Sequence, residues 1–331
     1  MKKRVLLLFL TAACTAAFLG GCKKNVGTPE DNAVVEEPEE EENEKESGRL
    51  FGYSCIDMSN PFYETLRDSI QTSLEEQGDS LMTKDPGSDV NTQIEQIQDM
   101  IGAEVDAVFL CPVDWEAITP ALEALEEADI PVINLDTEVK DADYITAFVG
   151  SDNRNAGYVC GEDLIEKKPD GGRIVIVESS SVNSVIERIT GFEEAISNAG
   201  FEVVQRIDAG GDMSAVKSAV AEIIQSGEQI DAIMCGNDQM AEQVLAALSE
   251  AGNSDPLVYS VDGSPVTKSA LLDPGSPMEG IGAQSPINMG KTAVKVAAAV
   301  LNGTAFDRET YEETFFINRD NVEMYGTDGW Q

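Results

Sequence analysis

The sequence from residue 50 onward alternates short apolar segments with longer amphipathic ones, and this alternation constrains the fold more than any other feature. The short runs predict buried strands, and the spacing of apolar residues between them predicts helices. Such alternation favours parallel sheets with helices on both faces. The expected strands are 50–56, 80–84, 105–111, 131–135, 145–149, 173–177, 202–207, 232–235, 257–261 and 280–283, and the expected helices are 62–77, 91–101, 116–127, 155–167, 185–198, 214–225, 239–250 and 288–301.

Part of the first half of the sequence recurs in the second half. Segment 105–111 (VDAVFLC) matches 230–235 (IDAIMC), and after the next expected helix 130–136 (IPVINLD) matches 256–262 (PLVYSVD). The spacing between the paired segments is nearly the same in both halves. The sequence therefore predicts two lobes built on one plan.

The second pair of matching segments ends in Asp136 and Asp262. Open parallel sheets bind ligands at the carboxyl ends of their strands, which is where both aspartates fall. If the lobes face each other, the two carboxylates converge from opposite sides of a cleft. An aspartate after a strand is also typical of a helix N-cap or a turn. The matched pair favours a ligand-binding role.

Composition narrows the class of protein. The 331 residues suggest about two domains, and 42% hydrophobic residues are enough to build their cores. A formal net charge of -39 disfavours binding to nucleic acid or to anionic lipid headgroups. The complete absence of histidine excludes Ser-His-Asp and Cys-His catalysis and His-ligated metals. A binding protein without a metal is the leading class, and no G-x-G-x-x-G or Walker-type loop predicts a nucleotide cofactor, so we expect no cofactor.

The first residues predict export. Residues 1–4 carry three positive charges, and 5–18 are apolar but too few for a comfortable transmembrane helix. Leu19-Gly20-Gly21-Cys22 resembles the bacterial lipobox, whose cysteine is lipidated and becomes the new N-terminus after cleavage. The alternative is an uncleaved or simply secreted N-terminus in which Cys22 is not lipidated. Residues 23–48 hold 10 acidic and three basic residues, which indicates a solvated spacer between anchor and body.

Four cysteines lie in the body of the chain. Cys55, Cys111 and Cys235 end apolar runs, and none of the four, Cys160 included, belongs to a Cys-x-x-Cys motif. Buried thiols acting as small hydrophobic groups are therefore expected. A bridge between Cys55 and Cys111 stays open if their strands are neighbours.

Six short motifs, in order along residues 50–318, resemble one known family: the sugar-binding proteins of ABC importers with the type 1 periplasmic-binding fold, closest to the ribose-binding branch. The motifs are 57–63 (DMSNPFY), 134–136 (NLD), 187–192 (ERITGF), 236–241 (GNDQMA), 261–263 (VDG) and 284–286 (QSP). The resemblance implies an α/β protein of two doubly wound parallel-sheet lobes joined by a hinge that the chain crosses several times.

The resemblance also implies a set of ligand-binding residues. Aspartates would accept hydrogen bonds from sugar hydroxyls, arginine and amide groups would donate to sugar oxygens, and aromatic rings would cover an apolar sugar face. Asn60 and Phe62 also fit an N-cap and a core residue, and Asp238 is expected to cap its helix. The predicted ligand-binding residues are Asn60, Phe62, Tyr63, Asp136, Thr137, Arg188, Asn237, Asp262 and Gln284.

Two departures from the ribose-binding pattern bear on specificity. Thr137 stands where those proteins carry an arginine, and segment 209–213 (AGGDM) lacks the aromatic residue that they place over the sugar. One cation and one stacking surface are missing from the expected cleft. A hexose or another polyol is therefore plausible in place of ribose.

The sequence thus predicts a lipid-anchored, extracytoplasmic solute-binding protein that captures a sugar by hinge closure and delivers it to an ABC permease. It is expected to be monomeric and not to be an enzyme. The alternative is a sensor that presents its ligand to a membrane receptor or kinase. A repressor-type sensing domain is disfavoured, because it would need an N-terminal helix-turn-helix where residues 1–48 indicate an export signal and a spacer. The expected domains are the signal 1–22, the spacer 23–48, a first lobe of 49–150 plus 285–310, and a second lobe of 151–284 plus 311–331.

Overall fold

The structure is a computed structural model that describes residues 48–210 and 212–331. The expected export segment, the lipidation site Cys22 and the spacer up to residue 47 lie outside the described residues. The strands are β1 (Leu50–Ser54), β2 (Ser80–Lys84), β3 (Ala107–Leu110), β4 (Val132–Leu135), β5 (Ala147–Ser151), β6 (Gly172–Glu178), β7 (Phe201–Asp208), β8 (Ala232–Cys235), β9 (Leu257–Asp262), β10 (Met278–Ala283), β11 (Glu309–Glu312) and β12 (Phe315–Asn318).

Helices connect most of these strands. They are α1 (Pro61–Glu75), α2 (Val90–Gly102), α3 (Thr119–Glu127), α4 (Asn153–Lys167), α5 (Asn183–Ile196), α6 (Met213–Gln225), α7 (Asp238–Ala251), α8 (Pro265–Leu272), α9 (Pro286–Leu301) and α10 (Val322–Tyr325), with a 3-10 turn at Ala142–Tyr144.

The two sheets repeat one topology, as the sequence echo predicts. The first has the strand order β2-β1-β3-β4-β5-β11 and the second the order β7-β6-β8-β9-β10-β12. All neighbouring strands run parallel except β12, which is antiparallel to β10. The fold is therefore two parallel-sheet α/β lobes, and the predicted fold class is confirmed. We call the lobe around the first sheet the first lobe and the other the second lobe.

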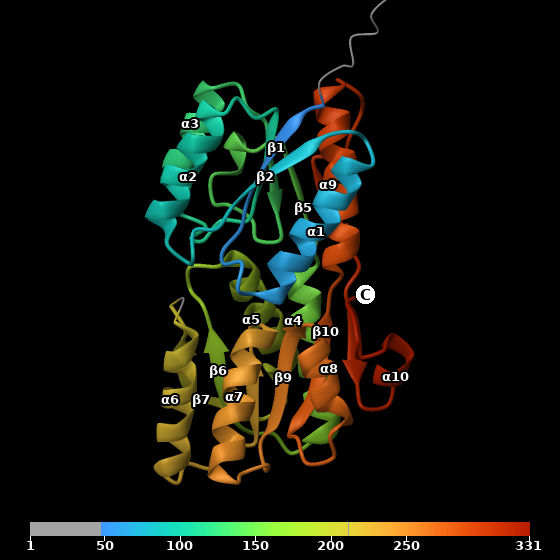
Figure 1. Ribbon diagram of the computed structural model, residues 1–331. Helices are drawn as coiled ribbons and strands as arrows, with labels where there is room; N and C mark the ends of the chain where they lie inside the picture. Colours follow the sequence, from blue (N-terminus) through green and yellow to red (C-terminus); the bar gives the residue numbers. More distant parts are fainter. Residues whose placement is uncertain (1–47, 211) are drawn as a thin grey trace, which may run out of the picture. The chain divides into compact units, whose positions relative to one another are not determined.

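Each sheet is covered by helices on both faces because its strands are apolar on both sides. In the first lobe α1 pairs with α9 on one face, while α2 and α3 cover the other (Figure 1). In the second lobe α4 and α5 cover one face, and α6, α7 and α8 cover the other. Residues Leu66, Ile70 and Leu74 of α1, spaced by four, are buried against the first sheet.

The chain passes between the sheets three times. It leaves the first sheet after β5, returns to it through α9, which packs on α1, β4 and β5, and crosses again between β11 and β12. These crossings lie near 150–151, 284–285 and 309–316, where the sequence predicts a hinge. They join the lobes along the edge formed by the last strands of each sheet.

The structure differs from the expected elements at a few points. The expected helix 116–127 begins only at Thr119, because the Asp114 side chain accepts hydrogen bonds from the backbone N–H groups of Glu116 and Ala117 and closes a turn there. Helices α8 and α10 and strands β11 and β12 were not expected. The last two have only four residues each; β11 (ETYE) is polar and half-exposed, and β12 (FFIN) is apolar but too short to show a periodic pattern.

The four cysteines of the described chain are free and buried. β1 and β3 are neighbours in the first sheet, yet no bridge joins Cys55 to Cys111. Burial raises the pKa of Cys55 to about 12. These thiols therefore act as small apolar groups.

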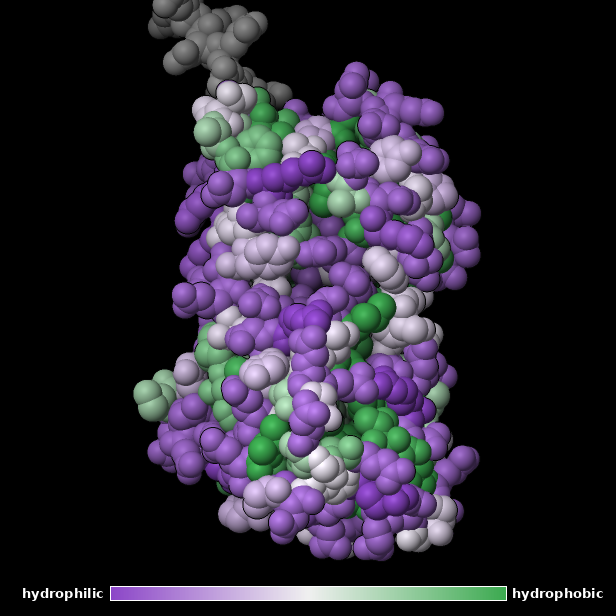
Figure 2. Space-filling view, turned by 180° about the vertical axis from the view of Figure 1, so that it is seen from behind, coloured by the Kyte–Doolittle hydropathy of each residue, from purple (hydrophilic) through white to green (hydrophobic). Residues whose placement is uncertain are grey.

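The surface is largely polar. Figure 2 shows hydrophilic residues spread over the face seen there, with apolar ones in separate patches. None of the helices within 48–210 and 212–331 combines the length and the apolar character that a bilayer crossing needs.

Candidate functional site

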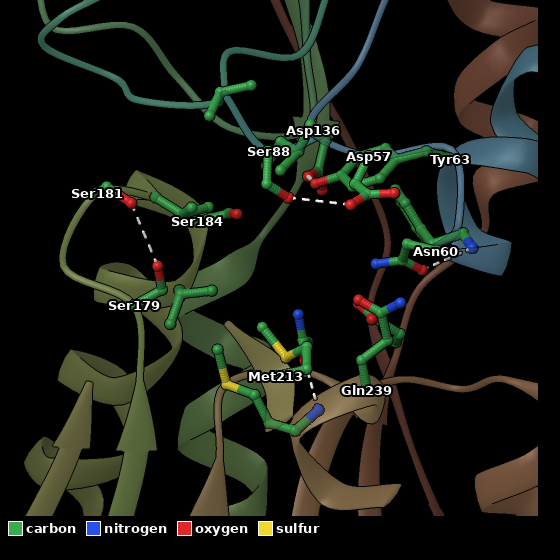
Figure 3. Close-up of a pocket in the computed structure, with 18 of the residues that line it drawn as sticks. Asp57, Asn60, Tyr63, Ser88, Asp136, Ser179, Ser181, Ser184, Met213 and Gln239 are labelled. Atoms are coloured by element: carbon green, nitrogen blue, oxygen red, sulfur yellow. Dashed lines mark hydrogen bonds between the residues drawn. The ribbon is translucent and has the colours of Figure 1, made fainter. Parts of the chain in front are cut away.

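A cavity of about 120 Å³ lies where the carboxyl ends of the two sheets face each other. Side chains of both lobes line it: Asp57, Tyr63, Ser88 and Asp136 from the first lobe stand opposite Ser179, Met213 and Gln239 from the second (Figure 3). A water molecule needs roughly 10–15 Å³ when cavities are measured in this way, so the cavity has room for a small sugar. This is the place predicted from the carboxyl-end rule.

The two repeated aspartates lie on opposite walls of the cavity. Asp136 directly follows β4 and Asp262 ends β9, and their side chains are 2% and 4% exposed. Both have positive φ angles, +61° and +130°, as does the cavity residue Ser88 at +63°. Such backbone geometry costs about 1–3 kcal/mol per non-glycine residue and concentrates at functional sites. Three of the five non-glycine residues with positive φ among those described line this one cavity.

Arg188, from α5 of the second lobe, joins the two aspartates. Its Nη2 lies 3.6 Å from Asp136 Oδ1 and its Nη1 lies 3.2 Å from Asp262 Oδ1. Nε donates to Asn153 Oδ1 at 2.7 Å and Nη1 donates to the Gly236 carbonyl at 3.0 Å, so the guanidinium is held in place. All three charged groups are buried. One cation therefore serves two carboxylates.

The two buried carboxylates share one cation, so the attraction of Arg188 offsets only part of the cost of removing them from water. Desolvation raises the pKa of Asp136, against the opposing effects of Arg188 and Tyr63. Desolvation also raises the pKa of Asp262 to about 7, with Arg188 opposing and the nearby carboxylates Asp238 and Asp136 adding to the rise. Asp136 Oδ1 has no hydrogen-bond donor among the described residues. A ligand hydroxyl fits this acceptor.

Two asparagines cap helices and line the cavity at the same time. Asn60 Oδ1 accepts from the Phe62 N–H and caps α1, and Asn237 Oδ1 accepts from the Met240 N–H and caps α7. Capping uses the oxygen of each amide, so the nitrogen, a donor, is left for the cavity. The capping and ligand-binding interpretations of Asn60 are therefore compatible.

The aromatic side of the cavity comes from the first turn of α1. The rings of Phe62 and Tyr63 meet edge to face with centroids 5.3 Å apart. The Tyr63 hydroxyl donates to Asp136 Oδ2 at 3.0 Å, which links the aromatic pair to the first-lobe carboxylate. Both rings are buried and both line the cavity.

Seven of the nine predicted ligand-binding residues line the cavity: Asn60, Phe62, Tyr63, Asp136, Arg188, Asn237 and Asp262. Thr137 and Gln284 do not line it and are fully buried behind it. Thr137 Oγ1 accepts from the Ser184 N–H at 3.0 Å, which ties the first lobe to the second. Gln284 Nε2 donates to Asp262 Oδ1 at 2.7 Å and orients that carboxylate.

Asp238 does not cap α7, contrary to expectation, because Asn237 does. Instead it accepts hydrogen bonds from the Ser260 and Thr267 hydroxyls and from the N–H groups of Gly263 and Ser264. It thereby fixes the loop that follows Asp262. A single motif match could not separate the two roles, since both need an acceptor at the start of the helix.

Sequence reasoning missed several polar residues of the cavity wall. Ser179 and Ser181 follow β6, and Ser88 donates to Asp57 in the first lobe. The signal was present in the sequence: a run of serines directly after a buried strand marks a carboxyl end, as the aspartates do. Met213 and Gln239, which begin or nearly begin helices, carried no such signal.

The lining of this site can both accept and donate hydrogen bonds. It offers carboxyl acceptors, one held arginine, two amide donors, several hydroxyls and two rings. In the described part of the chain, no group of three or more acidic or cysteine side chains is placed to hold a metal ion.

Comparison with known proteins identifies the family of the chain. The model of the periplasmic binding protein domain matches residues 51–305. The chain is 27% identical over 247 residues to the ribose import binding protein of Salmonella typhimurium, covering 74% of this chain and 82% of that protein. Similar solved structures include those of ABC transporter solute-binding proteins.

Two of these structures contain small polyhydroxy ligands. One is from Mycobacterium smegmatis with bound glycerol, at 26% identity, a TM-score of 0.79, and coverage of 86% of this chain and 99% of that one. The other is from Bacillus halodurans with bound myo-inositol, at 26% identity, a TM-score of 0.78, and coverage of 85% and 98%. This chain therefore belongs to the periplasmic binding protein domain family and is homologous to ribose import binding proteins.

Proposed function

We propose that this chain is a lipid-anchored, extracytoplasmic solute-binding protein that captures a small sugar or polyol by hinge closure and delivers it to an ABC permease. One observation carries the proposal: Asp136 and Asp262, from equivalent positions of two repeated lobes, meet Arg188 around one enclosed cavity. The family, whose members bind solutes outside the cytoplasm, supports the location.

The cavity suits neutral ligands with neighbouring hydroxyl groups. Ionised Asp136 and Asp262 accept charge-assisted hydrogen bonds, while the amides of Asn60 and Asn237 donate. Phe62 can cover an apolar ring face. Within the described residues, the charged ones that line the cavity are three aspartates and one arginine, so uronates and sugar phosphates are disfavoured.

Contacts between the lobes support a closed form that ligand stabilises. The Trp115 N–H donates to the Ser181 carbonyl at 3.0 Å, and the Ser184 N–H donates to Thr137 Oγ1 at 3.0 Å. A ligand that touches both aspartates has higher affinity for this arrangement than for a separated one and shifts the population towards it. The permease would then distinguish closed from open.

A thermal-shift screen of pentoses, hexoses and polyols tests the proposal. A ligand at 100 times its Kd stabilises the native state by about 2.7 kcal/mol and raises the melting temperature. We expect at least one neutral sugar or polyol to do so, and the matching uronate or sugar phosphate not to. A panel in which only anionic compounds shift the transition would contradict the proposed ligand class.

The anchor rests on Leu19-Gly20-Gly21-Cys22, outside the described residues. We expect metabolic labelling with a fatty acid to mark the protein in cells and Cys22→Ala to abolish the label. Cys55→Ala is the matched control, because Cys55 is buried in the first lobe and should leave labelling intact. Fatty-acid label that persists in the Cys22→Ala variant would contradict the prediction that Cys22 is the lipidated residue.

A further inference from the structure

The last residues of the chain lie beside the cavity, beyond the region that the family model matches, which ends at residue 305. Segment 326–331 follows α10 of the second lobe. Lys268 Nζ, from α8, donates to the Gly329 carbonyl at 2.5 Å, and Gln331 Nε2 donates to the Tyr325 carbonyl at 3.0 Å. The Ser285 hydroxyl, at the start of α9, donates to the Gln331 carbonyl. Second-lobe and hinge residues thus hold this segment, which we call the tail.

Trp330 in the tail contacts an aromatic residue of the first lobe. Its ring meets that of Phe62 at 5.8 Å between centroids and 75° between planes, and it packs on the first-lobe core. Phe62 in turn meets Tyr63 edge to face, and the Tyr63 hydroxyl donates to Asp136. Three successive contacts therefore connect the tail to the first-lobe carboxylate in the cavity.

We propose that Trp330 is a positioning residue for ligand binding: anchored on the second lobe, it holds the Phe62 ring against the cavity and favours the closed arrangement of the lobes. The proposal rests on the proposed function of the cavity. Phe62 belongs to the first-lobe core, lines the cavity on one side and contacts Trp330 on another, so the second-lobe tail adds a contact that holds its ring beside the cavity. Edge-to-face packing restricts the ring to one orientation, which lowers the entropic cost of binding.

The contact itself can be tested without any ligand. The chain has two tryptophans, so Trp115→Phe leaves Trp330 as the single tryptophan, whose fluorescence can be excited selectively over that of tyrosine. We expect acrylamide to quench Trp330 weakly in this variant and more strongly when Phe62→Leu is added, because the larger ring no longer covers the indole. Equal quenching in both variants would overturn the proposal.

The effect on binding is measured with the tightest neutral compound of a panel containing D-ribose, myo-inositol and the common hexoses. Trp330→Ala should weaken its binding about tenfold, or 1.4 kcal/mol, mainly through faster dissociation. Trp330→Phe should restore most of the loss. Lys268→Met, which frees the tail at Gly329, should weaken binding in the same direction.

Tyr325→Leu is the matched control. Tyr325 is an aromatic residue just before the tail, but it stacks on Phe315 within the second lobe, 5.0 Å between centroids. We expect it to change stability without changing affinity. Wild-type affinity in Trp330→Ala, or an equal loss in Tyr325→Leu, would overturn the positioning role. If no compound of the panel binds the wild type, the proposed function fails, and the quenching result alone decides the contact between Trp330 and Phe62.

Discussion

The two lobes have the same strand order but hold their cleft aspartates differently. In the first lobe a neutral side chain braces the loop after Asp136: Asn134 donates to the Thr137 carbonyl and accepts from the Val139 N–H. In the second lobe a buried carboxylate, Asp238, braces the loop after Asp262. A repeated scaffold can thus place matching ligand groups with different supporting chemistry, and the second lobe carries more buried negative charge.

The compensating cation is also unequally shared. Arg188 is the sixth residue of α5, and the sixth residue of α1, the equivalent helix of the first lobe, is Leu66, which lies in the core. Among the residues that the structure describes, Arg188 is the only cation that lines the cavity; it comes from the second lobe and reaches Asp136 across the cleft. The first-lobe half of the site therefore has no cation beside its carboxylate until the lobes meet, whereas the second-lobe half pairs Arg188 with Asp262 within its own lobe.

The largest effect should come from removing this shared cation. Arg188→Leu leaves two buried carboxylates without a cation, although each keeps one hydrogen bond, so we expect a loss of about 3–5 kcal/mol in the free energy of unfolding near pH 7.5. The loss should shrink at pH 5, because Asp262, whose pKa is about 7 even with Arg188 beside it, is then largely protonated. Urea denaturation at both pH values measures it, and ligand binding should be lost as well.

Arg154 provides the control for that experiment. It also lies in the second lobe and pairs with Glu187 and Glu194, but these groups are exposed. Arg154→Leu should leave stability close to wild type, because exposed ion pairs contribute little. Similar losses in both variants would show that the shared cation in the cleft has no special role.

A smaller effect is expected for the difference in affinity between D-ribose and other sugars. Thr137 provides no guanidinium, and Met213 lines the second-lobe wall where an aromatic residue would stack. We expect D-ribose to bind more weakly than some larger or differently substituted sugar by at least about 1.4 kcal/mol, or tenfold. Calorimetric titration of the panel measures the difference. Ribose as the tightest ligand would show that other cleft residues compensate for the two departures.

The smallest expected effect is a pH dependence of ligand affinity, which comes from Asp262 in the second lobe. In the free protein the pKa of Asp262 is about 7, above its unfolded value, so this group destabilises the ligand-free fold as pH rises towards 7. Hydroxyl donors of a ligand favour the ionised form and lower the pKa in the complex. Affinity should therefore rise between pH 6 and 8, by less than about tenfold per unit, with proton release.

Asp238→Asn sharpens this prediction. The Asp238 carboxylate contributes to the raised pKa of Asp262, so its neutralisation should move the rise in affinity to lower pH. Calorimetry in buffers of different ionisation enthalpy measures the protons released. A binding profile that is flat between pH 6 and 8 in both proteins would contradict the raised pKa.

The sequence predicted the repeated scaffold because buried strands and the recurring segments are local patterns. Asp136 and Asp262 could be placed opposite each other because both stand at the carboxyl ends of equivalent strands, Asp136 directly after β4 and Asp262 as the last residue of β9. Even the other aspartates of the echo behave alike: Asp106 accepts from the Leu50 N–H, and Asp231 accepts from the Arg173 N–H. A repeat in the sequence therefore carries three-dimensional information.

The rest depends on packing between segments far apart in the chain. Thr137 and Gln284 flank the cleft in sequence, but which way each side chain points is set by partners 47 and 22 residues away. Trp330 lies 268 residues from Phe62 in the sequence, and neither position carries a signal of the other. Such contacts have no periodicity to detect.

The central claim is that one ligand contacts the aspartates of both lobes at once. Calorimetric titration of the tightest panel sugar into wild type, Asp136→Ala and Asp262→Ala tests it most directly. We predict one binding site per chain in the wild type and a loss of at least about 2 kcal/mol in each variant, because ligand hydroxyls desolvated in the closed cleft lose charged partners. Wild-type affinity in either variant would contradict the claim and leave that aspartate with a purely structural role.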